Sequence, residues 1–418
     1  MNFKKPELLL PAGNFEALQT ALLYGADAVY AGLPDLSLRA SEGFTAESME
    51  QAVRYVHEKG KKIYLTLNLF SRNADVPKLE SFARTVRCLR PDALIVSDAG
   101  VFAFMREKVP EIALHVSTQA NVSSYLTVDF WRKMGAKACV LSRETSFEEI
   151  CEIKEKCPDI RIETFIHGAM CMSYSGRCLL SSFMTGRSAN QGKCAQSCRW
   201  EYDVYLQEKK RPEEFIKVEQ DERGTYFMNS KDLCLMPRLD RILQAGIDIL
   251  KIEGRNKTPY YVAATARAYR QAIDDWFENP QKWSFEKYQT ALDNLQNRGY
   301  CLGFFDGFTP EMQNYETTQS QGKRRNAGVI RAWEKDGAVF EIRHKLERGG
   351  SLIFLPPEGG REITVKVPEV IDFPSKKTVE AISAGKKGQA VFLPNEFFEG
   401  ISQIELPVLS VAQTPFVS

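Results

Sequence analysis

The first two-thirds of the chain alternates short apolar runs with segments of helical period. The runs are ELLLPAG from Glu7, AVYAGL from Ala28, IYLTLN from Ile63, ALIVSD from Ala93, IALHVST from Ile112, ACVLSR from Ala138, IRIETFIHG from Ile160 and ILKIEGR from Ile249. Helical spacing of apolar residues is found between them, at 14–24, 46–59, 76–89 and 147–156. Apolar strands separated by helices are typical of a parallel sheet that is covered on both faces.

One junction recurs between a helical segment and the next apolar run. Gly25, Gly135 and Gly246 each stand where a helix ends and a strand begins, a position that favours glycine because φ is positive there. No GxGxxG follows the first run, which disfavours a doubly wound dinucleotide fold. Eight repeats of this unit therefore predict a (β/α)8 barrel of the TIM type.

Polar residues gather where the apolar runs end. They are Asn68, Asp98, Ser117, Gln119, Arg143, Glu144, Glu163, His167, Glu253 and Arg255. In a parallel barrel these positions meet at the carboxyl face, where the active sites of such barrels lie. Strand ends are also polar simply because loops begin there, so the pattern leaves both interpretations open.

Two further regions complete the organisation. A long irregular segment at about 172–229 interrupts the barrel after its seventh strand, and helices are expected at 237–244, 259–277 and 285–297. After a polar linker, SQGKRRNAG, the chain alternates as VIRAW, AVFEIRH, SLIFLP, EITVKV, AVFLP and QIELPVL, which predicts a small all-β barrel. We expect a catalytic domain at 1–318 and a β domain at 319–418.

Composition narrows the class of protein. The 418 residues are 44% hydrophobic and 26% charged, and the formal net charge of +1 argues against a chain that coats nucleic acid non-specifically. No apolar stretch approaches the length of a membrane span or of a signal-peptide core, so we expect a cytoplasmic protein with no membrane partner. The ten cysteines should then be reduced, which points to metal binding or thiol chemistry.

Four of these cysteines fall close together in the expected insertion. Cys171, Cys178, Cys194 and Cys198 are spaced C-x6-C-x15-C-x3-C among glycines, and Cys234 follows later. Zinc sites usually bring two short Cys pairs, and only one is present here. Four soft ligands on a glycine-rich loop suit an iron–sulfur cluster, while zinc and reduced structural thiols stay open.

The strings around the first cysteines resemble the signature of a known family. ETFIHGAMC from Glu163 and GRCLLS from Gly176 are similar to the collagenase-like peptidases of unassigned mechanism, the peptidase U32 type. PELLLPAGN, GADAVYAG, CAQSCRW, SKDLCL and KIEGR extend the resemblance over essentially the whole chain. The pattern is closest to the tRNA hydroxylation branch, which helps to form 5-hydroxyuridine at the wobble position.

The resemblance implies an activity, cofactors and partners. The expected reaction is an oxygen-independent, prephenate-dependent hydroxylation of the tRNA wobble uridine, with prephenate as co-substrate. A 4Fe-4S cluster is implied on Cys171, Cys178, Cys194 and Cys198, with Cys234 as the alternative ligand. A paralogous partner protein and an electron donor are further candidates.

Candidate site residues follow from the strand ends. Glu163 and His167 share one strand end and are the candidates for proton transfer. For substrate binding we select Arg39, Gln119, Arg143, Glu253 and Arg255, because an arginine fork matches a carboxylate. Ion pairing for Glu163 and the arginines, and a core position for His167, are the structural alternatives.

Two other functions stay open. The chain has no HExxH, and a thiol protease would need His167 to activate Cys171, which cannot then be a cluster ligand. An RNA-binding assembly factor without catalysis is the third class. Basic residues and aromatics interleave near the insertion: Arg177, Arg187, Lys193, Arg199, Lys209, Lys210 and Arg211, Lys323, Arg324 and Arg325 in the linker, and Tyr174, Phe183 and Trp200.

Overall fold

The larger part of the protein is a closed barrel of eight parallel strands, as expected. The computed structural model describes residues 4–33, 37, 43–171, 177–187, 189, 193–200, 205–207, 215–217, 230–307, 312, 320–385 and 388–415. The strands are β1 (Glu7–Pro11), β2 (Ala28–Gly32), β3 (Lys62–Leu67), β4 (Ala93–Val96), β5 (Ala113–Val116), β6 (Ala138–Val140), β7 (Arg161–Ala169) and β11 (Ile249–Ile252). β11 pairs with both β1 and β7, which closes the barrel.

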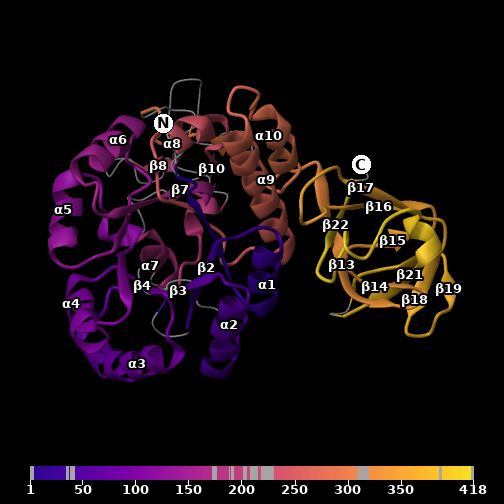
Figure 1. The fold of residues 1–418 in the computed structure, drawn as a ribbon, viewed down its shortest axis with the longest axis horizontal. Coiled ribbons are helices and arrows are strands. Elements are labelled where there is room, and N and C mark those ends of the chain that lie inside the picture. The colour runs from indigo at the N-terminus through magenta and orange to yellow at the C-terminus, as the bar shows by residue number, and fades with distance from the viewer. Residues whose placement is uncertain are drawn as a thin grey trace.

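Helices surround the strands in an outer ring (Figure 1). They are α1 (Phe15–Leu23), α2 (Ala46–Glu58), α3 (Val76–Leu89), α4 (Ala99–Lys108), α5 (Tyr125–Lys133), α6 (Phe147–Lys156), α8 (Leu239–Gln244), α9 (Pro259–Glu278) and α10 (Glu286–Asp293). Gly25, Gly135 and Gly246 have φ of +99°, +96° and +68°, which confirms the predicted junctions. No helix in the described part of the chain is long and apolar enough to cross a membrane.

Aspartates at the amino end of the barrel tie neighbouring strands together. Each stands just before one strand and accepts a hydrogen bond from a backbone N–H of an adjacent strand: Asp27 from Leu8 at 3.0 Å, Asp92 from Ile63 at 2.9 Å and Asp248 from Ile162 at 2.8 Å. These bonds satisfy backbone donors and fix the strand register.

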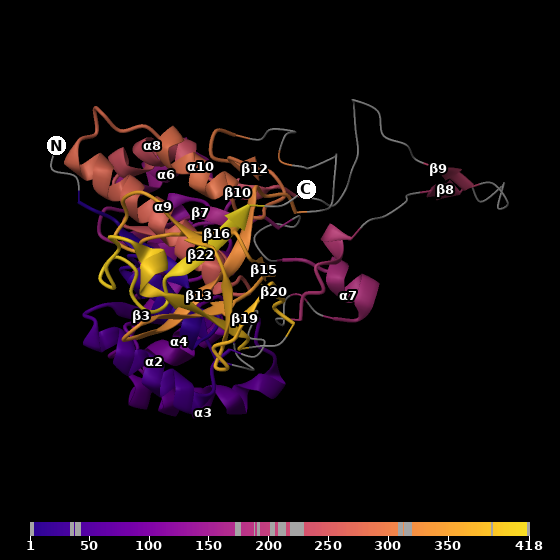
Figure 2. The same ribbon diagram turned by 90° about the vertical axis from the view of Figure 1, so that its right-hand side faces the viewer.

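Two further strands extend the sheet from β7, outside the barrel. β10 (Asp232–Cys234) pairs antiparallel with β7, and β12 (Tyr300–Cys301) pairs with β10. The short helix α7 (Leu180–Thr185) lies beyond the end of the barrel opposite the N-terminus, which is the carboxyl end of the strands (Figure 2). β8 (Tyr205–Gln207) and β9 (Phe215–Lys217) form a hairpin, and most of the expected insertion lies outside the described residues.

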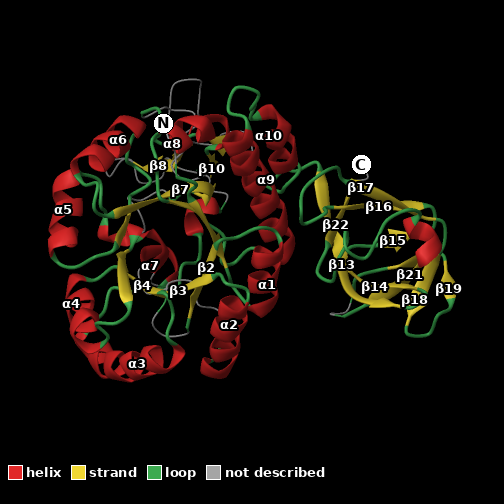
Figure 3. Cartoon of the chain, viewed as in Figure 1, coloured by secondary structure: helices red, strands yellow, loops and turns green. Residues whose placement is uncertain are grey.

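The C-terminal part forms an antiparallel sheet that curves into a half-barrel (Figure 3). Its strands are β13 (Arg324–Glu334), β14 (Gly337–Ile342), β16 (Gly350–Phe354), β17 (Ile363–Val367), β18 (Val370–Phe373), β19 (Thr378–Val379), β21 (Ala390–Pro394) and β22 (Val411–Pro415); β15 (Leu346–Glu347) and β20 (Ala381–Ile382) pair separately. The predicted boundary at 318/319 falls outside the described residues.

Two expectations for this part were wrong. QIELPVL is a turn segment rather than a strand, because Pro407 has no N–H to donate and Leu406 is buried as an anchor in the core. The last strand begins only at Val411. The expected linker is strand from Arg324 onward, because Arg324 to Asn326 pair with β22.

The two parts share a buried interface. The hydroxyl of Tyr24, the residue that caps the end of α1, donates to the carbonyl of Leu355 at 2.8 Å and accepts from the N–H of Val411 at 3.0 Å. The Tyr260 hydroxyl of α9 donates to Gln413 at 2.7 Å. Because Leu355 and Val411 belong to the same hydrophobic cluster as the barrel helices, the half-barrel extends the barrel's own core.

Candidate active site at the carboxyl end of the barrel

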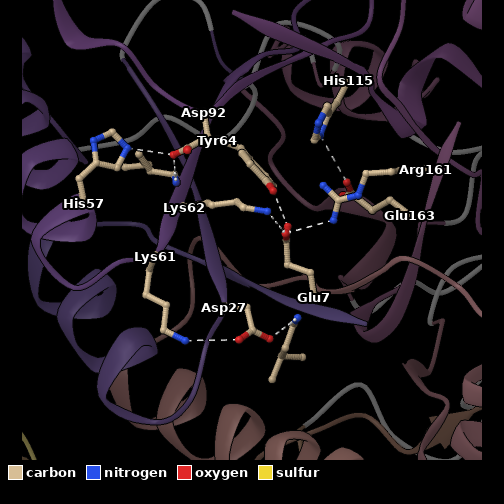
Figure 4. A network of polar contacts seen from close by, with 12 residues as sticks. Glu7, Asp27, His57, Lys61, Lys62, Tyr64, Asp92, His115, Arg161 and Glu163 are labelled. Carbon is tan, nitrogen blue, oxygen red and sulfur yellow. Dashed lines mark hydrogen bonds and ion pairs between the residues drawn. The ribbon is translucent and has the colours of Figure 1, made fainter. Parts of the chain in front are cut away.

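The interior of this barrel is charged. Contacts between strands that are not neighbours must cross the interior, and several do so (Figure 4). Glu7 of β1 accepts from Lys62 of β3 at 2.8 Å, from Arg161 of β7 at 3.1 Å and from the Tyr64 hydroxyl. The Tyr64 ring packs 4.9 Å from the His115 ring of β5. TIM barrels are usually filled by bulky branched residues, so this polar interior is a specific feature of the chain.

Glu163 lies at the centre of the interior. Its Oε1 is 2.5 Å from Nζ of Lys251 on β11, and its Oε2 is 3.9 Å from Nδ1 of His115. Within the described residues, neither that Oε2 nor that Nδ1 has a hydrogen-bond partner, and both are buried. An unpaired buried polar group costs about 1–3 kcal/mol, so this arrangement is one that packing alone does not favour.

Burial shifts the pKa of each member of this cluster. Burial raises the pKa of Glu163, which the neighbouring Lys251 opposes. Burial lowers the pKa of Lys251; Glu163 opposes this, and Arg255 and Arg143 lower it further. Burial also lowers the pKa of His115 to about 3, with help from Arg161 and Lys251, so the imidazole is neutral. These directions all favour the uncharged forms.

Three cations share two aromatic rings above this cluster. Lys251 Nζ lies 4.4 Å from the ring centre of Tyr30 and 5.4 Å from that of Phe165. The guanidinium of Arg143 lies 4.0 Å from the Phe165 ring, and that of Arg255 lies 6.0 Å from the Tyr30 ring. The shared rings place all three cations at the carboxyl end of the barrel interior.

The other predicted substrate-binding residues lie at the same end. Arg255 is buried and donates to Ser37 at 2.6 Å and Thr66 at 2.8 Å. Gln119 accepts hydrogen bonds from the hydroxyls of Ser97, at 3.3 Å, and Ser117. Glu253 is buried and accepts from the N–H of Ala169 at 3.3 Å. Arg39 lies outside the described residues.

The structure separates Glu163 from His167, which the sequence had placed together. The His167 ring packs against Tyr261, Tyr269 and Tyr300, with ring centres 5.3–5.9 Å apart, and Nδ1 is 3.4 Å from the Tyr269 hydroxyl. Burial lowers its pKa to about 3. His167 therefore sits between the barrel and α9 and does not share the interior cluster with Glu163.

The cause of this separation is an irregularity in the sheet. Opposite β11, Phe165 pairs with Lys251 but His167 pairs with Ile252, so β7 has one extra residue there. Strand side chains alternate between faces, and an inserted residue reverses the alternation. Without it, His167 would point inward as Glu163 and Phe165 do.

The predicted metal ligands are spread over the segment near α7. Cys171, Cys178 and Cys198 are half-buried, Cys194 is exposed, and Cys234 is buried on β10. Burial raises the pKa of Cys234 to about 11, and its sulfur lies 3.8 Å from Tyr269 Oη and Gln289 Oε1. Among the described residues, no three His, Cys, Asp or Glu side chains are arranged to hold a metal ion. The thiols suit an iron–sulfur cluster chemically, whereas their arrangement here does not form its ligand set.

Lys251 and His115 lie in the interior cluster but are not among the residues predicted from the sequence. Each is a polar residue inside an otherwise apolar strand, in ILKI and ALHV. The signal was available, because a buried charge needs a partner and a lysine in a buried strand implies a facing carboxylate.

These features define a TIM-barrel protein with a charged interior. We call the carboxyl end of that interior, with Arg143, Lys251 and Arg255, the cationic mouth. Residues 13–314 match the model of "Peptidase family U32", which is more than half of the chain, so the chain belongs to this family.

Its relatives have two kinds of name. It is 39% identical over 406 residues to tRNA hydroxylation protein P of Escherichia coli (strain K12), covering 87% of this chain and 88% of that protein. It is 38% identical over 361 residues to tRNA hydroxylation protein P1 of Bacillus subtilis (strain 168), covering 85% and 84%. A protein named collagenase from Porphyromonas gingivalis (strain ATCC BAA-308 / W83) is 30% identical over 411 residues, covering 94% and 95%.

Proposed function

We propose that this protein hydroxylates the wobble uridine of tRNA to 5-hydroxyuridine without oxygen, using prephenate as co-substrate. The observation that carries the proposal is the 39% identity to tRNA hydroxylation protein P, which extends over 87% of this chain and 88% of the relative. Similarity of that extent covers most of the chain and most of the relative.

The barrel mouth supplies groups that suit an anionic co-substrate. Prephenate has two carboxylates, and an arginine guanidinium binds a carboxylate through two parallel hydrogen bonds. Arg143 and Arg255 lie on either side of Lys251, each over a ring that Lys251 also contacts. In a buried site these cations act at low dielectric, where electrostatic attraction is strong.

The segment around α7 offers a surface for unpaired bases. Phe183 in α7 is 86% exposed, and Trp200, which follows a turn in contact with α7, is 46% exposed. The helix α7 lies beyond the carboxyl end of the barrel (Figure 2). Arg177, Arg187 and Lys193, which lie close to α7 in the sequence, are also exposed. Aromatic side chains that stack on splayed bases, with cations for the phosphates, are the usual means of recognising single-stranded RNA loops.

We propose that Cys171, Cys178, Cys194 and Cys198 would together hold a 4Fe-4S cluster, which requires their thiols to come closer together than they are in the described structure. Two facts support this proposal. Four cysteine thiolates are the usual ligands of such a cluster, and none of these four cysteines is fully buried. Cys234 suits the cluster less well, because its thiol is buried and lies 3.8 Å from both Tyr269 Oη and Gln289 Oε1. Bound, such a cluster supplies electron transfer. A paralogous partner and an electron donor complete the proposed system.

The proposal is tested by measuring 5-hydroxyuridine in the tRNA of a host that lacks its own tRNA hydroxylation protein. The chain is expressed in that host without oxygen, the tRNA is hydrolysed, and 5-hydroxyuridine is measured by mass spectrometry. We expect the nucleoside to reappear. Its absence, with folded protein that still binds tRNA, would overturn the proposal in favour of an RNA-binding assembly factor.

Proteolysis is the alternative that the collagenase relative raises. It requires His167 to activate Cys171. Within the described part of the chain, the ring of His167 packs against three tyrosines. Its low pKa also makes it a poor base at neutral pH. The contacts and the lowered pKa of His167 therefore do not support a thiol protease built on His167 and Cys171.

A further inference from the structure

We propose that the side-chain amine of Lys251 condenses with the carbonyl of a small 2-oxo acid, forming an imine inside the barrel mouth. Lys251 projects inward from β11, is 4% exposed, and lies beneath Tyr30 and Phe165. This inference deepens the proposed function, on which it rests, by naming the substrate class of the mouth and the bond formed there.

The surroundings of Lys251 are those of a nucleophilic amine. A lysine attacks a carbonyl only when it is unprotonated, and neighbouring cations and desolvation favour that form. Burial lowers the pKa of Lys251, and Arg255 and Arg143 act in the same direction. Nζ is 2.5 Å from Glu163 Oε1, which places a proton acceptor in direct contact with the amine.

The arginines define what the carbonyl compound must contain. Arg143 and Lys251 share the Phe165 ring, and Arg255 and Lys251 share the Tyr30 ring. A ligand that reaches Lys251 with its carbonyl therefore has a guanidinium near its neighbouring carboxylate. A carboxylate next to a ketone is a 2-oxo acid, and the pyruvyl side chain of prephenate has this group.

The reaction balances without an external oxidant or reductant. Glu163 takes one proton from the Lys251 ammonium, and the amine lone pair attacks the carbonyl carbon as the C=O π pair moves to oxygen. The second amine proton and the proton held by Glu163 pass to that oxygen, which leaves as water. A C=N bond replaces the C=O bond, and the carboxylate is unchanged.

A purely structural ion pair is the competing explanation. Buried ion pairs contribute little net stability even when every polar atom is satisfied. Here Glu163 Oε2 and His115 Nδ1 lie 3.9 Å apart without hydrogen-bond partners among the described residues. An oxygen of Glu163 that is not engaged is the atom needed to accept and return protons beside the amine.

Borohydride trapping tests the inference on the whole purified protein without tRNA. The folded protein is incubated with pyruvate and sodium borohydride, digested, and mapped by mass spectrometry. We expect Lys251 to gain the mass of pyruvic acid less one oxygen atom, with Lys62 at the other end of the interior unmodified. Lactate, which has the carboxylate but no ketone, should give no adduct.

Two outcomes would overturn the inference. One is the absence of an adduct at Lys251 in folded protein. The other is labelling of Lys62 and of surface lysines to the same extent as Lys251. Arg143→Lys and Arg255→Lys keep the charge but remove the fork, and should each reduce the adduct at Lys251 about tenfold at limiting pyruvate. Unchanged trapping in both variants would contradict the assigned carboxylate site. Because no tRNA is present, these results are independent of whether hydroxylation occurs.

Discussion

Lys251 and Glu163 form an ion pair inside the barrel, with Nζ 2.5 Å from Oε1 and both side chains almost fully buried. The pair joins β11 to β7, the two strands whose pairing closes the barrel. It also lies between the contacts of Glu7 at the amino end and the arginines at the mouth. The ion pair that joins the two closing strands is therefore also the site of the proposed chemistry.

The low pKa of His115 makes stability depend on pH. The unfolded histidine binds a proton below about pH 6.5, whereas the folded one, facing Tyr64, Glu163, Arg161 and Lys251, binds it only near pH 3. Stability is therefore lost as pH falls from 6.5 to about 3, amounting to about 2 kcal/mol from this group at pH 5. Urea unfolding at pH 7.5 and 5 should show a smaller loss for His115→Gln than for the unsubstituted protein. Equal losses would contradict this account.

The Tyr24 hydroxyl should stabilise the contact between the barrel and the half-barrel. Tyr24→Phe leaves the Leu355 carbonyl and the Val411 N–H without this partner, at a cost of about 1–3 kcal/mol. Urea unfolding of the whole chain measures the loss. Tyr55→Phe, at a half-buried tyrosine of α2, is the matched control and should change little. Similar values for the two variants would mean that Tyr24 has no special role.

The cysteine assignment predicts how bound iron depends on single residues. After purification without oxygen, Ser variants of Cys171, Cys178, Cys194 and Cys198 should each lose most of their iron. Cys88→Ser, on the exposed surface of α3, should keep it. Full iron in any two of the four variants would disprove the ligand set, and full iron in Cys198→Ser alone would transfer the fourth position to Cys234.

Exposed aromatics near α7 should bind tRNA by stacking. Phe183→Ala and Trp200→Ala should each weaken binding by about 1–3 kcal/mol per stacked base. Lys193→Ala should instead reduce the slope of log K against log salt by about 0.7–0.9. Phe130, 52% exposed on α5, is the aromatic control, and Phe130→Ala should bind normally. Equal effects at Phe130 and Phe183 would exclude a specific platform at α7.

Most of the barrel could be predicted because its signals are local. Each apolar run became a strand, and the glycine junctions marked where helices end, since both depend on neighbouring residues alone. The strand at Val411 was missed because the apolar run before it, with Leu406 and Pro407, anchors a turn in the core. Apolar content alone does not distinguish an anchor from a strand.

The site was harder to predict because it depends on register. Arg143 and Arg255 lie at the carboxyl end of the barrel, where residues that follow a strand are expected, since a strand's end can be read from the sequence. The orientation of His167 depends on an extra residue in β7. That residue is recognised as extra only when the pairing of β7 with β11 is known. Lys251 was not predicted for a different reason: the run ILKIEGR was treated as an apolar strand, and the lysine inside it was not considered as a site residue.

If the cationic mouth of the barrel carries out tRNA hydroxylation, as proposed, the modification should depend on Arg143 and Arg255. The measurement is the level of 5-hydroxyuridine in tRNA from a host that lacks its own hydroxylation protein and expresses this chain, Arg143→Lys or Arg255→Lys. We expect modified tRNA with the unsubstituted chain and severe loss in both variants, with tRNA binding and folding retained. Full levels of 5-hydroxyuridine in both variants would contradict it.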